Sequence, residues 1–163
     1  MRPGRESNID KANLPCTGDF LVGGQMAVVT DKFGLETQGA SDLIDVTPEV
    51  ARALERSELT NGICNVFVPG STGALTTLEY EPGLVNDVKD FFDRVIPEGD
   101  YDHNRRWGDG NGHAHVRAAL VGPSVSIPFA DRSLLLGRWQ QIVFADLDNR
   151  PRSRELTVTM VGE

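Results

Sequence analysis

The sequence is poor in residues and motifs that mark several common protein classes. It has two cysteines in 163 residues, Cys16 and Cys64, which do not predict a disulfide framework, so we expect a cytoplasmic protein. No apolar run approaches the ~20 residues of a membrane helix, and the first 20 residues lack the apolar segment of a secretory signal. We therefore expect no membrane partner.

Phosphate-binding motifs of the GxxxxGK[ST] or GxGxxG type are also missing. The formal net charge of -8 argues against general binding to nucleic acids. Basic residues are unevenly distributed, because all eight that follow position 100 are arginines. Ordinary surface charge explains any one of them. As a cluster they favour a small anionic ligand, because guanidinium groups match phosphate and carboxylate oxygens.

The pattern of elements predicts a single α+β domain, with a mixed or mostly antiparallel sheet and about three helices packed on it. Residues 1–22 are polar and aperiodic, and we interpret them as a flexible tail before a domain over residues 23–163. Helix-start signals occur at Thr47-Pro48, Pro82 and Asn111. The expected strands cover residues 25–37 (with an interruption at 31–34), 63–69, 74–80, 124–129, 134–144 and 155–161.

A short polar loop, Gly70-Ser71-Thr72-Gly73, joins two of these strands. Such a loop can offer backbone N–H groups and the hydroxyls of Ser71 and Thr72 to an anion. It can equally serve only as a turn.

All three histidines of the chain, His103, His113 and His115, lie within one segment of 13 residues. Asp109 and Asn111 lie between them and alternate with glycines. In a strand, His113 and His115 would project from one face, whereas in a helix they would point about 200° apart. The alanines and the apolar spacing after His115 favour a helix.

A helix that begins after Asn111 exposes unpaired N–H groups and a positive dipole end. We expect the imidazoles, the Asp109 carboxylate and these amides to form one pocket for phosphate, with or without a divalent ion. The expected metal ligands are His103, His113 and His115, with zinc favoured over magnesium or manganese.

Four stretches together resemble the YjbQ family: NVFVPGSTGALTTLEYEPGL at residues 65–84, YDHNRRWGDGNGHAHVRAALVGPS at 101–124, LLLGRWQQIVF at 134–144, and DNRPRSRELTVTMVGE at 148–163. The resemblance implies an α+β domain that assembles as a homotrimer. It also implies activity similar to that of secondary thiamine-phosphate synthases, which join a pyrimidine pyrophosphate to a thiazole phosphate and release pyrophosphate.

The resemblance also implies a set of functional residues. The expected catalytic residues are His103, Asp109, His113 and Glu79, and the expected ligand-binding residues are Ser71, Thr72, Asn111, Trp139, Gln140 and Arg152. Trp139 would lie against the pyrimidine ring, or would be an ordinary core aromatic. The chain departs from many members of the family, which have histidine at the position of Gly70 and Asn-Glu at Leu78-Glu79.

Two other functions fit the same residues. One is a metal-dependent hydrolase of a small phosphorylated metabolite. The other is a non-catalytic trimeric protein that binds a phosphorylated ligand.

Overall fold

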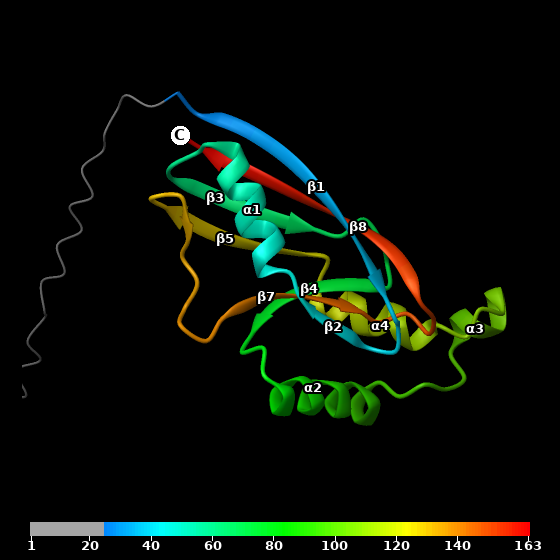
Figure 1. Cartoon of the computed structure of the whole chain (residues 1–163). Coiled ribbons are helices and arrows are strands. Elements are labelled where there is room, and N and C mark those ends of the chain that lie inside the picture. The colour runs from blue at the N-terminus through cyan, green and yellow to red at the C-terminus, as the bar shows by residue number, and fades with distance from the viewer. Residues whose placement is uncertain (1–24) are drawn as a thin grey trace, which may run out of the picture.

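The computed structural model describes residues 25–163, and the tail predicted over residues 1–22 lies outside them. The chain forms two antiparallel sheets, with strand orders β1-β8-β3-β5-β6 and β2-β7-β4 (Figure 1). The strands are β1 (Ala27–Thr37), β2 (Asp42–Asp45), β3 (Gly62–Phe67), β4 (Gly73–Leu78), β5 (Ser124–Ala130), β6 (Ser133–Leu134), β7 (Gln141–Asp146) and β8 (Arg152–Gly162). The helices are α1 (Thr47–Ser57), α2 (Pro82–Val95), α3 (Asp102–Trp107) and α4 (Gly112–Val121).

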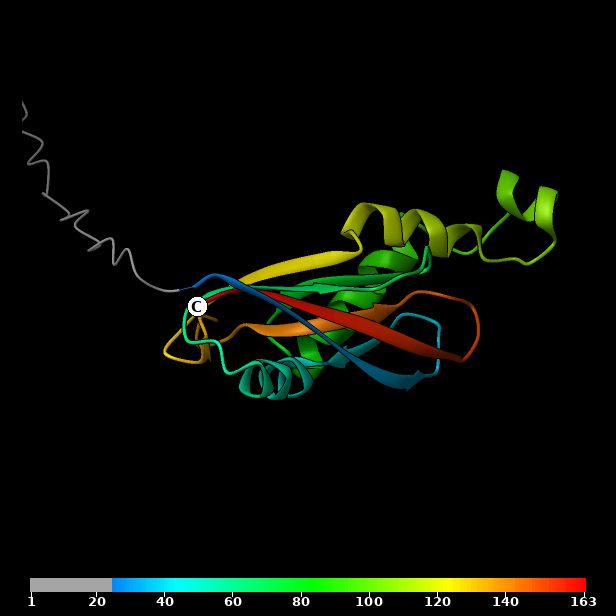
Figure 2. The same ribbon diagram turned by 90° about the horizontal axis from the view of Figure 1, so that it is seen from above.

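Strand β7 lies at the centre of the small sheet and is buried on both faces. Ile142 and Phe144 belong to a core shared with α1 and the large sheet, whereas Val143 and Ala145 pack in a second core with α4. This division follows from the alternation of side chains along a strand. Helices α1 and α4 accordingly lie on opposite sides of the strands (Figure 2).

The predicted α+β domain with an antiparallel sheet is confirmed. All strand pairings among residues 25–163 are antiparallel. The interruption expected at residues 31–34 is absent, because β1 pairs with β8 without a break from Ala27 opposite Gly162 to Thr37 opposite Arg152. No helix among these residues is long and apolar enough to cross a membrane.

Three helices begin where the start signals predict them, at Thr47, Pro82 and beside Asn111. Helix α3 is an addition to the predicted three. Asp102 in its first turn and arginines in its last turn complement the helix dipole, and Gly108 ends it with a φ of 73°.

The strand predicted over residues 134–144 is wrong over its first half. The chain leaves the large sheet after Leu134 and enters the small sheet at Gln141. Between them, the Gly137 N–H donates to Gln140 Oε1 (2.8 Å) and the Gln140 N–H donates to the Gly137 carbonyl (2.9 Å). These two bonds close a turn that takes Trp139 out of the sheet.

Candidate functional site

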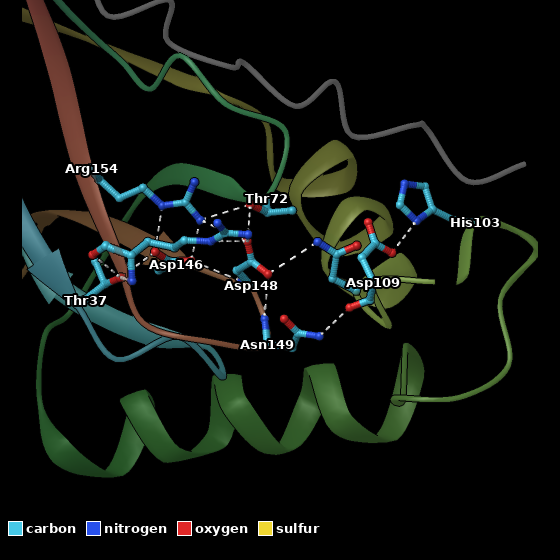
Figure 3. Close-up of polar contacts among 10 residues, drawn as sticks. Thr37, Thr72, His103, Asp109, Asp146, Asp148, Asn149 and Arg154 are labelled. Carbon is cyan, nitrogen blue, oxygen red and sulfur yellow. Dashed lines mark hydrogen bonds and ion pairs between the residues drawn. The ribbon is translucent and has the colours of Figure 1, made fainter. Parts of the chain in front are cut away.

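A buried carboxylate, Asp146, lies where β7 ends and the turn to β8 begins, and hydrogen-bond donors surround both of its oxygens. Asp146, the last residue of β7, accepts hydrogen bonds from Thr37 Oγ1 (2.6 Å) and from two guanidinium nitrogens of Arg154 (2.7 Å each) (Figure 3). Asp146 is fully buried, and the side chain of Arg154 is only 13% exposed. The pair is stable inside the protein because each charge is neutralised and hydrogen-bonded.

A second buried carboxylate, Asp148, connects this turn to the loop before β4. It accepts hydrogen bonds from Thr72 Oγ1 (3.1 Å), Arg152 Nε (2.8 Å) and the Asn149 N–H (2.8 Å). Burial raises the pKa of Asp148, but the bonds from Arg152 and Asn149 outweigh this effect and hold the pKa below its ordinary value. Asp148 is therefore ionised and fixes Thr72 relative to Arg152.

The start of α4 is attached to the same turn. The side-chain amide of Asn111 lies between two carboxylates, 3.4 Å from Asp148 in one orientation and 3.1 Å from Asp109 when the amide is turned over. We favour the turned orientation, because it satisfies both the nitrogen and the oxygen of the amide. Asn149 Nδ2 donates to the Asp109 carbonyl at 2.9 Å (Figure 3).

Two of the three histidines, His103 and His115, lie close together beside Asp109 and Asn111. The ring centroids of His103 and His115 are 4.4 Å apart. His103 Nδ1 lies 3.2 Å from Asp109 Oδ1, which is an ion-pair distance, although the groups are not aligned for a directional hydrogen bond. His103, His115 and Asp109 thus form one polar cluster.

His113 lies apart from that cluster, so the expectation that three imidazoles converge is corrected. Its side chain is buried, with its ring 6.4 Å from that of Tyr101 and Nε2 3.6 Å from Glu98 Oε1. Its Nδ1 has no hydrogen-bond partner in the part of the chain that the structure describes. Burial, followed by the nearby positive charge of Arg117, lowers the pKa of His113. The separation arises because His113 and His115 are two residues apart on a helix.

The residues present do not fit the expected three-histidine metal site. Over residues 25–163 no three or more His, Cys, Asp or Glu side chains are arranged to hold a metal ion. Binding of zinc or another divalent ion stays a prediction, which elemental analysis of tag-free protein tests.

Two hollows lie next to α4 and the loop that precedes it. The first, here called the polar cavity, has a volume of about 460 Å³ and is lined by Gly108, Asp109, Asn111, Asn149, Arg150 and Arg152. The second, here called the apolar hollow, has a volume of about 330 Å³ and is lined by Gly70, Ser71, Gly73, His115, Ala118, Ala119 and Pro123. Asn111 and His115 line different hollows but lie one helical turn apart, so the two spaces are neighbours.

The remaining predicted site residues lie at the opposite end of the small sheet. Strand β4 pairs with β7 from Gly73 opposite Asp146 to Leu78 opposite Gln141, a length of roughly 17 Å. Glu79 and Trp139 are exposed at the far end of that ladder, and Gln140 donates to Thr77 Oγ1 there (3.4 Å). Within one chain they do not reach the histidines.

Several residues of the site were missed by sequence reasoning. They are Asp146, Asp148, Asn149, Arg150 and Arg154. One feature of the sequence DLDNRPRSR could have indicated them. Its two aspartates are two positions apart, and its three arginines also follow one another at intervals of two positions. That spacing places like side chains on one face of an extended chain.

Comparison with known proteins gives consistent matches along most of the chain. Residues 31–163 match the sequence model of the family described as UPF0047 protein YjbQ-like. A UPF0047 protein of Methanothermobacter thermautotrophicus is 39% identical over 139 residues, which cover 85% of this chain and 95% of that protein. A UPF0047 protein of Mycobacterium tuberculosis is 33% identical over 127 residues, covering 72% of this chain and 96% of that protein.

Solved structures agree with the sequence matches. A YbjQ-like protein of unknown function from Sulfolobus solfataricus superposes with a TM-score of 0.80 at 32% identity, covering 85% of this chain and 100% of that one. A YjbQ/UPF0047 protein from Clostridium acetobutylicum gives a TM-score of 0.73 at 33% identity, covering 80% of this chain and 98% of that one. The chain therefore belongs to the UPF0047 (YjbQ-like) family.

Proposed function

We propose that the polar cavity binds the phosphoryl group of a small phosphorylated metabolite, and that the protein is a transferase similar to secondary thiamine-phosphate synthases. The observation that carries the proposal is the position of Arg150 and Arg152 on the wall of the polar cavity, beside the side-chain amides of Asn111 and Asn149. Guanidinium and amide donors of this kind suit phosphate oxygens.

The two arginines have different roles in this proposal. Arg152 is held by Asp148, with Nη2 2.6 Å from the carboxylate, so its charge is largely neutralised and its position is fixed. Arg150 is exposed and has no ion pair among residues 25–163. Its charge is available to an incoming anion. The negative charge of Asp109 repels an anion in the same cavity. The imidazole of His103, which lies beside Asp109, reduces this repulsion when it carries a positive charge.

Alkyl transfer with pyrophosphate as the leaving group depends mainly on stabilising the departing charge. Arg150, with Arg152 and the side-chain amide of Asn149 beside it, would stabilise it. Incubating the full-length protein with the pyrimidine pyrophosphate and the thiazole phosphate should yield thiamine phosphate. Product no greater than in a protein-free reaction would reject the transferase. Phosphate binding without turnover would instead select the non-catalytic binding protein.

The charge of Arg150 is directly testable. Replacing it with glutamine (Arg150→Gln) should weaken binding of inorganic pyrophosphate about tenfold, because a charge-assisted hydrogen bond contributes roughly 1.5–3 kcal/mol. Isothermal titration calorimetry measures the change. The matched control is Arg132→Gln, an exposed arginine in the turn between β5 and β6 of the large sheet. Equal losses in the two variants would show that binding follows net charge alone.

We propose in addition that the protein is a homotrimer, as its resemblance to the family implies. The position of Glu79, Trp139 and Gln140 supports assembly, since these residues can join the histidine cluster only from another copy of the chain. Light scattering coupled to size-exclusion chromatography should give about three times the chain mass of 17.8 kDa. A mass equal to one chain at micromolar concentration would contradict the trimer.

A further inference from the structure

We infer that Gly39 is a positioning residue for Arg150, and that the loop between β1 and β2 holds this arginine at the wall of the polar cavity. The inference rests on the proposed function, in which Arg150 supplies the positive charge that binds the phosphoryl group. Gly39 does not itself line the polar cavity. It would act through the backbone of Arg150, against which it packs.

The loop between β1 and β2 has a strained backbone. Gly39, Ala40 and Ser41 are consecutive residues with positive φ, of 72°, 53° and 60°. Glycine adopts this left-handed region freely, but alanine and serine adopt it at a cost in free energy. Such a backbone persists only where the surrounding contacts hold it, and strained positions of this kind cluster at functional sites. The contacts of the three residues therefore indicate what the loop serves.

Gly39 is buried against the turn from β7 to β8. A methyl group built on Gly39 would lie 2.7 Å from the carbonyl carbon of Arg150 and 2.9 Å from its nitrogen, and closer still to its carbonyl oxygen. No side chain fits there unless the backbone of Arg150 moves. That backbone is also restricted by Pro151, because a residue before proline avoids the helical region. The missing side chain at Gly39 thus sets the point from which the guanidinium of Arg150 extends.

Ala40 and Ser41 attach the loop to two elements that line the polar cavity. The Ala40 N–H donates to the Asp148 carbonyl at 2.6 Å, two residues before Arg150. Ser41 is buried, and its Oγ accepts a hydrogen bond from Arg117 Nη1 of α4 at 3.0 Å. The loop therefore connects the turn that carries Arg150 with α4, and contacts on both sides hold its left-handed conformation.

Calorimetry with inorganic pyrophosphate on the full-length protein tests the positioning role. Gly39→Ala should weaken binding about tenfold, as expected for Arg150→Gln, because it displaces the backbone that carries the guanidinium. Gly39→Asn should show the same loss with better folding, since asparagine adopts left-handed φ more readily but still meets the Arg150 backbone. The matched control is Gly122→Ala. Gly122 also has a positive φ, of 104°, but a methyl group there meets nothing within 4 Å, so pyrophosphate binding should be unchanged.

A double-mutant cycle separates positioning from a general effect on the fold. In a protein that already carries Arg150→Gln, Gly39→Asn should cause no further loss of pyrophosphate binding, because the group that Gly39 positions is absent. Additive losses would overturn the inference, since Gly39 would then act other than through Arg150. Unchanged binding by Gly39→Asn would also overturn it.

NMR spectroscopy of the unliganded protein distinguishes failure of this inference from failure of the proposed function. Gly39→Asn should shift the backbone amide resonance of Arg150, whereas Gly122→Ala should not. An Arg150 resonance that stays unchanged in Gly39→Asn would overturn the inference even if pyrophosphate binds. If the resonance shifts but the unmodified protein does not bind pyrophosphate, Gly39 positions Arg150 as inferred and the phosphate proposal falls.

Discussion

Replacing Asp146 with alanine should lower the free energy of unfolding by about 3–5 kcal/mol, because it takes from the buried Arg154 the carboxylate that binds it directly. The Asp146 carboxylate is completely buried and accepts two hydrogen bonds from Arg154, one from Thr37 and one from the Asp148 N–H. Its removal leaves the guanidinium of Arg154 with only the more distant carboxylate of Asp148, at 3.7 Å, in an environment with little water. Most of the cost therefore arises from this poorly compensated buried charge, and a smaller part from the missing hydrogen bonds.

Urea denaturation at pH 7 measures this loss. The control is Glu155→Ala, which removes the partner of Lys32 in an exposed pair (2.7 Å) and should cost less than about 1 kcal/mol. The double variant Asp146→Leu/Arg154→Met removes both charges and should recover much of the stability lost by Asp146→Ala. A loss below about 1 kcal/mol for Asp146→Ala would mean that solvent reaches Arg154.

The same ion pair connects stability to the site. Arg154 Nη2 donates to Thr72 Oγ1 at 2.9 Å, and Thr72 in turn donates to Asp148. Loss of Asp146 therefore releases the loop before β4, which forms one wall of the apolar hollow. Thr72 also contacts Asp148, which holds Arg152 on the wall of the polar cavity. We therefore expect variants of Asp146 to weaken binding of inorganic pyrophosphate even under conditions in which they are folded.

Local signals in the sequence predict much of the fold. Proline at or near the first helical position marks α1 and α2, and period-two patterns mark β3, β5 and β8. The loop before β7 could not be predicted in this way, since its apolar residues resemble a strand. Its course depends on one side chain, Gln140, which accepts a hydrogen bond from the backbone of Gly137.

The segment that holds all three histidines supplies only part of the candidate site. Residues 101–120 contribute His103, Asp109, Asn111 and His115, as the clustering of histidines indicates. The rest of the site depends on contacts between distant segments, such as Thr72 with Asp148, 76 residues away. Sheet register brings these segments together, and a single sequence gives register only weakly.

His113 provides a pH-dependent prediction that follows from its burial. Burial and the charge of Arg117 lower its pKa in the folded state, while in the unfolded state it returns to about 6.5. The unfolded chain therefore binds more protons just below that pH. The stabilisation that comes from keeping His113 neutral should be fully present above pH 6.5. It should decrease as the pH falls towards the pKa of His113 in the folded state. The charged groups that face His113 are Arg117 on α4, Asp93 on α2, Glu98 after α2 and Asp148 after β7.

Urea denaturation at pH 7.5 and pH 5 tests whether the free energy of unfolding falls with decreasing pH. His113→Leu places an apolar side chain of similar size in the buried position, and its stability should fall less between the two pH values than that of the unmodified protein. Asp148 does not affect this comparison. Because its pKa is lowered in the folded state, its contribution to stability is lost only at pH values below about 3.8. An equal fall in both proteins would contradict the prediction. It would show that Glu98, whose carboxylate lies 3.6 Å from the ring, balances the effect of burial by stabilising the protonated imidazole.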